Sequence, residues 1–138
     1  DAKYNQQELT ISSKCSHDAY EKIFGYIHNR EVGIKKDSNT LFGIDKFTNK
    51  KNTNISFYNI RFHLYPGISA VKTIGGNSIL IQIKKNHSLI FKAKDAKISV
   101  EKSIFLGRNK ILNNLCILIS GKVDNISKTI NWEFKENI

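Results

Sequence analysis

Apolar and polar residues alternate along most of this chain. The segment 59–65 is the clearest case, because Ile60, Phe62 and Leu64 alternate with residues that are polar or charged. A period of two residues places the apolar side chains on one face of a β-strand, and the Pro-Gly pair that follows is typical of a turn. The sequence therefore predicts a strand here with one apolar face and one polar face.

Similar alternation recurs at nearly regular intervals, interrupted by short segments rich in Gly, Asn and Asp. We predict further strands over residues 8–15, 26–34, 41–47, 68–74, 78–84, 88–93, 96–107, 109–121 and 127–134. A polar loop is expected over 48–54, and His87 is expected in a turn. Many short strands separated by turns predict an all-β protein, an antiparallel β-sandwich.

One segment departs from this alternation. Helical spacing (i, i+3, i+4 and i+7) relates the side chains of Tyr20, Ile23, Phe24 and Ile27. Ser16 or Asp18 could cap the start of such a helix, and Gly25 interrupts it. We predict a short helical turn near 18–24 followed by a strand, with a longer helix through Arg30 as the alternative.

The chain has 138 residues, of which 40% are hydrophobic and 10% aromatic. These values predict a single folded domain over residues 1–138, without a linker or an internal repeat. Because the chain contains no methionine and begins at Asp1, we expect a piece of a longer protein that lacks the first strands of its sandwich. No stretch is long and apolar enough to be a candidate membrane span.

The net charge is +10, which suggests a polyanionic partner such as nucleic acid, acidic polysaccharide or anionic lipid. Codon bias is the alternative explanation, since the sequence is heavy in Lys, Asn and Ile. The lysines are also spread along the chain, whereas a polyanion-binding surface is expected to be clustered. Charge alone leaves both explanations open.

Candidate chemistry lies mainly on the polar face of the strand over 59–65. Arg61, His63 and Tyr65 share that face, and they could hold a carboxylate or sulfate, with the phenol stacking on a sugar ring. The alternative is that they form the solvated face of an ordinary antiparallel sheet. His17 stands beside Asp18, but adjacent strand residues point to opposite faces, so these two would cooperate only in a turn.

The sequence supports neither a metal site nor a known catalytic motif in this chain. The four histidines lack metal-binding spacing, and there is no phosphate-binding glycine loop and no nucleophile elbow. Cys15 and Cys116 are too few for a disulfide framework. Cys116 lies in an apolar run and is expected to be buried, and the sequence leaves a bridge between the two open.

Four phrases, taken in order, resemble the C-terminal part of bacterial heparinase II/III-like proteins. They are SHDAYEKIFGYIHNREVGIKKDSNTLFGIDKF, NIRFHLYPGISA, SILIQIKKNHSLIFKA with ISVEKSIFLG, and ISGKV followed by TINWEF. The chain departs from the family pattern at Ala19, where Gly is favoured, at Gly33, and at Tyr65, which replaces a second histidine.

The resemblance implies the C-terminal β-sandwich of a polysaccharide lyase that cleaves uronic-acid-containing glycans by β-elimination. In this family an N-terminal helical (α/α) toroid precedes the sandwich and carries most catalytic residues. Upstream residues also hold any divalent metal, such as zinc. No catalytic residue and no metal ligand can therefore be carried over to this chain, which is expected to be inactive alone. The resemblance also implies a bacterial periplasmic or cell-envelope location.

The resemblance and the polar face together predict which residues contact substrate. We expect Arg30, Arg61 and His63 to contact an acidic polysaccharide, and Tyr20 or Tyr65 to stack on it. The full set of predicted substrate-binding residues is His17, Tyr20, His28, Arg30, Arg61, His63 and Tyr65. The expected partners are the acidic polysaccharide and the N-terminal helical domain of the same protein. A free-standing carbohydrate- or polyanion-binding β-sandwich is the alternative. A nucleic-acid-binding barrel is disfavoured, because most phenylalanines lie on apolar faces.

Overall fold

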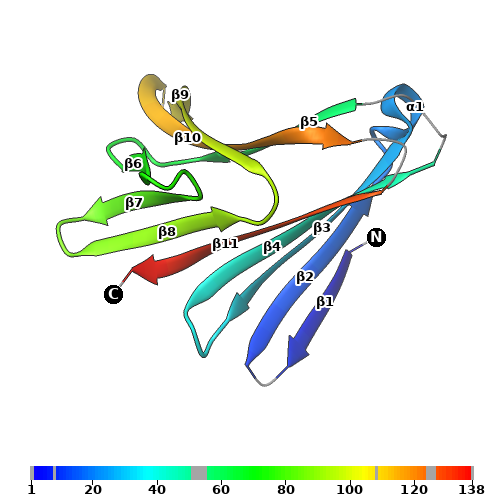
Figure 1. The fold of residues 1–138 in the computed structure, drawn as a ribbon, viewed down its shortest axis with the longest axis horizontal. Coiled ribbons are helices and arrows are strands. Elements are labelled where there is room, and N and C mark those ends of the chain that lie inside the picture. The colour runs from blue at the N-terminus through cyan, green and yellow to red at the C-terminus, as the bar shows by residue number, and fades with distance from the viewer. Residues whose placement is uncertain (1, 8, 51–55, 108, 124–126, 138) are drawn as a thin grey trace.

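The computed structural model describes residues 2–7, 9–50, 56–107, 109–123 and 127–137. Within these ranges the strands form two antiparallel sheets (Figure 1). The large sheet has the order β1-β2-β3-β4-β11-β8-β7-β6. Its strands are β1 (Ala2–Gln7), β2 (Thr10–His17), β3 (Tyr26–Lys35), β4 (Thr40–Asn49), β6 (Ser69–Lys72), β7 (Ser78–Lys84), β8 (His87–Ala93) and β11 (Lys128–Asn137). The predicted all-β antiparallel sandwich is confirmed.

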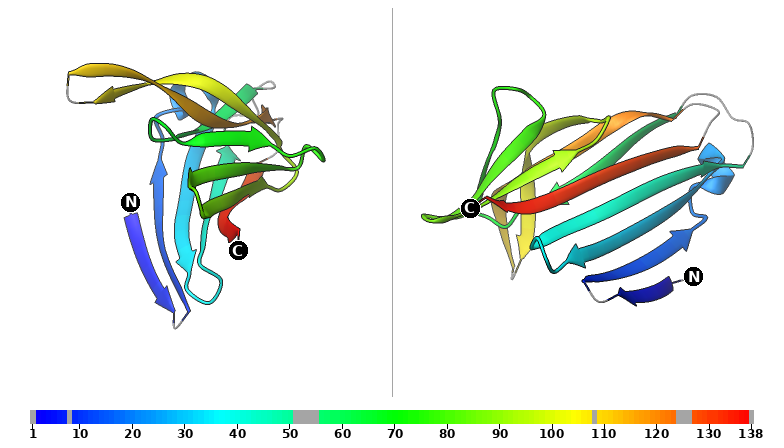
Figure 2. Two further views of the ribbon diagram at one scale, coloured as in Figure 1. Left: turned by 90° about the vertical axis from the view of Figure 1, so that its left-hand side faces the viewer. Right: turned by 60° about the horizontal axis from the view of Figure 1, so that its bottom comes forward.

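The small sheet has the order β5-β10-β9 and packs against one face of the large sheet. Its strands are β5 (Ser56–His63), β9 (Lys97–Gly107) and β10 (Lys110–Val123). Figures 1 and 2 show that β1 and the first part of β2 lie away from the small sheet, whereas the end of β2 approaches it near α1. The face of the large sheet that carries the core is therefore left open towards these edge strands.

The core lies between the two sheets and follows from the alternating pattern. Side chains that alternate along each strand meet at the interface, and most of them are β-branched or aromatic. The best buried are Ile79, Ile81, Phe91, Ile117, Ile119 and Ile130. Cys116 is buried as predicted, but it lies on the other face of β10, because its cross-strand neighbours there are His63 and Glu101.

The helical turn is confirmed, although its details differ from the prediction. Helix α1 spans only Glu21–Phe24, and Gly25 ends it with a left-handed φ of 75°. The alternative of a longer helix is wrong, since β3 begins at Tyr26. Neither Ser16 nor Asp18 provides a side-chain cap, because the N-cap residue is Tyr20. No helix in the described ranges is long and apolar enough to cross a membrane.

Strand boundaries also shift in several places. Strand β1 was not predicted, and His87, expected in a turn, is the first residue of β8 and lies 3.3 Å from Glu136. Thr48 and Asn49 belong to β4 rather than to the predicted polar loop. Residues 51–54 of that loop, and residue 8 of the first predicted strand, lie outside the described residues.

A close contact between β4 and β11 positions Trp132. Gly43 on β4 and Trp132 on β11 are cross-strand partners. A Cβ on Gly43 would come within 2.0 Å of Trp132 Cζ2. The indole therefore lies directly over the backbone of β4, where only glycine leaves room for it. This placement allows the indole nitrogen to reach the neighbouring carboxylate described below.

We predict that Gly43→Ala lowers the free energy of unfolding by about 3 kcal/mol, because the new methyl group overlaps the indole. Urea denaturation followed by tryptophan fluorescence measures the change. Gly75→Ala is the matched control, since a Cβ there meets nothing within 4 Å, and its effect should stay within about 0.5 kcal/mol. Equal stability of the two variants would contradict the packing described for Trp132.

Candidate functional site

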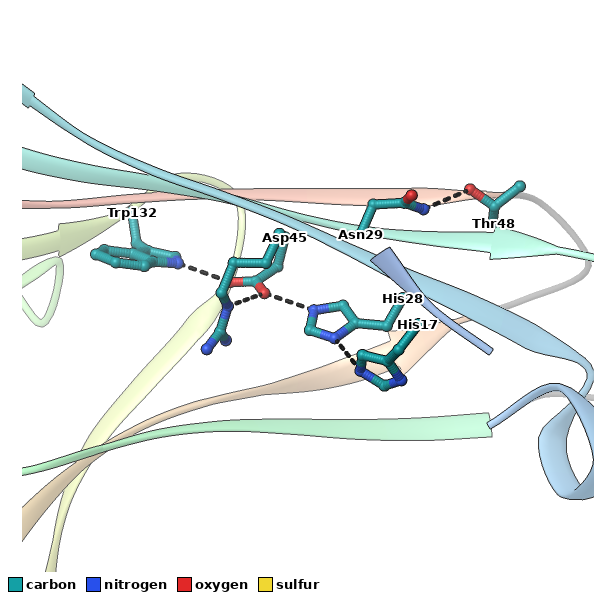
Figure 3. A network of polar contacts seen from close by, with 7 residues as sticks. His17, His28, Asn29, Asp45, Thr48 and Trp132 are labelled. Carbon is teal, nitrogen blue, oxygen red and sulfur yellow. Dashed lines mark hydrogen bonds and ion pairs between the residues drawn. The ribbon is translucent and has the colours of Figure 1, made fainter. Parts of the chain in front are cut away.

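A fully buried carboxylate lies where three strands of the large sheet meet. Asp45 Oδ1 accepts hydrogen bonds from His28 Nε2 and from Arg30 Nε, each at 2.6 Å (Figure 3). Asp45 Oδ2 accepts a third from Trp132 Nε1 at 2.7 Å. The strand register explains the contacts, because Asp45 stands opposite Arg30 on β3 and opposite Ile130 on β11. Charged and polar donors thus surround the carboxylate.

The electrostatic state of Asp45 follows from these contacts. Burial by itself raises the pKa of a carboxyl group, since it penalises the charged form. The hydrogen bonds from His28, Arg30 and Trp132, with the charge of Arg30, outweigh that penalty and hold the pKa of Asp45 below its ordinary value. Asp45 is therefore ionised and accepts hydrogen bonds only.

The network continues from Asp45 to the surface through two histidines. His28 Nδ1 lies 3.0 Å from His17 Nε2, and the two residues are cross-strand partners on β3 and β2. The His28 ring stacks on Phe47 with centroids 5.1 Å apart, and the His17 ring meets the edge of Tyr20 at 5.1 Å. These ring contacts fix both imidazoles in orientation.

The two histidines border a pocket of about 450 Å³, a volume in the range of small-ligand sites. Both sheets and helix α1 contribute to its walls. The side chains of β2 and β3 that line it are His17, Tyr26, His28 and Arg30, and those near α1 are Tyr20 and Phe24. Aromatic rings and hydrogen-bond donors therefore meet in a single pocket.

The structure brings together four of the seven predicted site residues, namely His17, Tyr20, His28 and Arg30. Arg61 also borders the pocket. Its guanidinium, however, lies 3.8 Å from Glu101, on the face of β5 away from the core.

The other two predicted residues belong to that outer face of the small sheet. His63 Nδ1 lies 3.1 Å from Ser103 Oγ, and the Tyr65 ring packs against Phe105. Arg61 shares this face with both, as the alternation predicted. The predicted set is thus divided between a pocket and an exterior surface, and the contacts of each with a ligand remain predictions.

The sequence did not identify two residues of the site, Asp45 and Trp132. Asp45 lies in the predicted strand over 41–47 and Trp132 in the predicted strand over 127–134, but neither was predicted as a site residue. Pairing β3 with β4 in register would have placed Asp45 opposite Arg30. The bond from Trp132 depends on the indole lying over Gly43, which no spacing in the sequence reveals.

The described residues contain no group of three or more His, Cys, Asp and Glu side chains that could hold a metal ion. Cys15 and Cys116 are both free, the first exposed and the second buried. Burial raises the pKa of the Cys116 thiol. The donors of the pocket suit an anionic oxygen group better than a cation, because Arg30 and the histidines offer N–H groups.

The fold places the chain among antiparallel β-sandwiches. Its residues 2–133 match the profile of the family described as "Heparinase II/III-like, C-terminal". The chain belongs to this family, as the resemblance implied. A search of curated proteins found no match.

Solved structures with the same fold include two heparinases. A heparan sulfate lyase, HepC from Pedobacter heparinus, superposes with a TM-score of 0.79 at 11% identity, over 98% of this chain and 21% of that one. A heparinase III gene product superposes with a TM-score of 0.76 at 8% identity, over 99% of this chain and 22% of that one. This chain thus spans about a fifth of the length of these structures.

We predict that Asp45→Asn lowers the free energy of unfolding at neutral pH by about 3 kcal/mol, since it leaves Arg30 and His28 without a charged partner. The folded-state pKa of Asp45 is depressed, so its contribution is present above the unfolded-state value of 3.8 and is lost as the pH falls through the folded-state pKa. Urea denaturation at several pH values tests this, and the difference between wild type and variant should shrink in acid.

Asp95→Asn is the control, because Asp95 is exposed and its φ of 54° suits asparagine. A deficit in Asp45→Asn that stays constant down to acidic pH would contradict the charged state assigned to Asp45.

Proposed function

We propose that this chain is the C-terminal β-sandwich portion of a polysaccharide lyase that cleaves uronic-acid-containing glycans by β-elimination. The family match over residues 2–133 is the observation that carries the proposal. The two heparinase structures that share the fold support it. In such a reaction a base removes the proton beside the uronate carboxyl group, the C4–O bond breaks, and a C4–C5 double bond forms.

We assign to this chain glycan binding rather than the chemical step. The family resemblance places the catalytic residues and any metal ligands upstream of the matched region. We therefore expect the chain to be inactive alone, and the whole protein to act in the periplasm or cell envelope.

The pocket is the part of the chain best suited to an acidic sugar. Arg30 donates its Nε–H to Asp45, and its side chain is 35% exposed. Its Nη groups make no hydrogen bond within the described residues. His17 adds a polar ring at the mouth, and Tyr20, which is 44% exposed, offers an aromatic face. A guanidinium beside aromatic rings suits a sugar with a carboxylate or sulfate.

A carbohydrate-binding module without catalysis is the second candidate. The observation that favours it is that one chain supplies every wall of the pocket. The two candidates differ in whether a protein containing this chain forms the unsaturated product.

Lyase activity is tested through the ultraviolet absorbance of the C4–C5 double bond after incubation with heparan sulfate. We predict that this chain alone produces no absorbance and that the whole protein does. Product formed by the chain alone would contradict the proposal that this chain binds the glycan without performing the chemical step. Glycan binding without product from the whole protein would favour the non-catalytic module.

We predict that Arg30→Gln weakens binding of heparan sulfate oligosaccharides about tenfold, which corresponds to the loss of one charge-assisted hydrogen bond. Isothermal titration calorimetry at two salt concentrations checks this, and wild-type affinity should fall as salt rises. Lys110→Gln is the charge-matched control, because this exposed lysine lies at the far end of the β9–β10 hairpin. A loss in His63→Gln, with none in Arg30→Gln, would move the ligand to the outer face of the small sheet.

A further inference from the structure

A continuous hydrogen-bonded chain runs from the core of the protein to the mouth of the pocket. It starts at the fully buried Asp45, passes through His28, whose side chain is 13% exposed, and ends at the exposed His17 (Figure 3). The two links measure 2.6 Å and 3.0 Å. Both are within the range of direct hydrogen bonds, so no water is needed between the groups.

The ionised carboxylate fixes the tautomer of each neutral ring. Asp45 can only accept, so His28 Nε2 must carry a hydrogen. In the neutral ring His28 Nδ1 is then an acceptor, and His17 Nε2 must donate to it. His17 Nδ1 is left as a lone-pair acceptor, with no hydrogen-bond partner among the described residues. The only basic nitrogen that this pair exposes therefore lies at the pocket mouth.

A proton that arrives at His17 Nδ1 can be passed inward along this chain. An N–H bond forms at His17 Nδ1, the Nε2–H bond of the same ring breaks, and its proton forms a new N–H bond at His28 Nδ1. The product is a neutral His17 and a His28 imidazolium, whose Nε2–H points at the Asp45 carboxylate 2.6 Å away. The positive charge thus comes to rest beside the group best able to stabilise it.

Because the neighbouring charges largely cancel, the added proton determines the net charge of the pocket. Arg30 and Asp45 carry opposite charges in direct contact, so they largely cancel. The charged and titratable groups that face or flank the two histidines are Cys15 on β2, Asp18, Tyr20 and Glu21 near α1, Tyr26 and Arg30 on β3, Asp45 on β4, Tyr58 and Arg61 on β5, and Lys128 on β11. Asp18 and Glu21 lie outside the pocket lining, and the guanidinium of Arg61 lies beside Glu101.

We propose that the pocket binds one anionic group, a carboxylate or a sulfate, together with one proton that His17 and His28 share. The proposal rests on the proposed function only for the source of that group, an acidic glycan. With the pair neutral, Arg30 is the cation that contacts the anion. With the pair protonated, the pocket gains a full positive charge on His28, beside Asp45.

The experiment is isothermal titration calorimetry of this chain with a heparan sulfate tetrasaccharide and, separately, with inorganic sulfate. Each titration is run at one pH in two buffers of different ionisation enthalpy, which counts the protons taken up. It is then repeated at several values between about pH 5.5 and pH 8, because imidazole groups of proteins generally change charge in this range. We expect uptake approaching one proton per anion on the alkaline side. There the affinity should rise about tenfold for each pH unit of acidification.

Two variants distinguish proton uptake by the histidine pair from anion binding by Arg30. His17→Gln removes the exposed proton acceptor but leaves Arg30 in place, so proton uptake should vanish while weak, pH-independent binding remains. His87→Gln is the matched control, because His87 pairs with Glu136 on β8 and β11 and lines no part of the pocket. It should bind like the wild type. Circular dichroism of each variant confirms that the sandwich is folded.

The outcomes distinguish this inference from the proposed function. Glycan binding without proton uptake overturns the inference and leaves the proposed function standing. Sulfate binding with proton uptake, but no glycan binding, supports the inference and overturns the proposed source of the anion. Failure of both ligands to bind at any pH overturns both, and proton uptake that survives His17→Gln overturns the relay.

Discussion

Asp45 is the one ionised side chain fully buried in the described part of the sandwich, and the site depends on how it is neutralised. An isolated buried carboxylate would cost several kcal/mol, so it persists only with good partners. Here the partners come from both neighbouring strands, with His28 and Arg30 on β3 and Trp132 on β11. Any shift in the register of these strands would leave the charge unpaired. The carboxylate thus favours a single pairing of the central strands.

The same carboxylate organises the pocket. It holds Arg30 by Nε, which leaves the outer part of the guanidinium free, and it orients His28, which in turn orients His17. The histidine pair lies where the end of β2 and the start of β3 approach β5 near α1, and residues of both sheets border the pocket there. The buried Asp45 is therefore connected directly to a pocket that a ligand can enter. The polar face of β5, by contrast, is the outer face of the small sheet, where Arg61 lies 3.8 Å from Glu101.

Much of the fold could be predicted, because alternation reports directly on which face of a strand is buried. Ile79, Ile81 and Ile130 occupy the core as their pattern indicated, and Gly25 ends the helical turn where it was expected to interrupt it. The assignment of strands to sheets could not be predicted, since alternation carries no information about partners. This is why the sequence grouped Arg61, His63 and Tyr65 as neighbours on one face but did not place His17 against His28. Asp45 was missed for the same reason, because its three donors are distant in sequence and meet only through pairing.

The central claim is that Asp45 sets the protonation states of both histidines as one unit, and ¹⁵N NMR of the imidazole rings over a pH titration tests it most directly. The account predicts that His28 Nε2 keeps its proton throughout the range in which Asp45 is ionised. It also predicts that the Nδ1 signals of both rings change together in one shared titration. Two independent titrations, or a neutral His28 protonated at Nδ1, would contradict it.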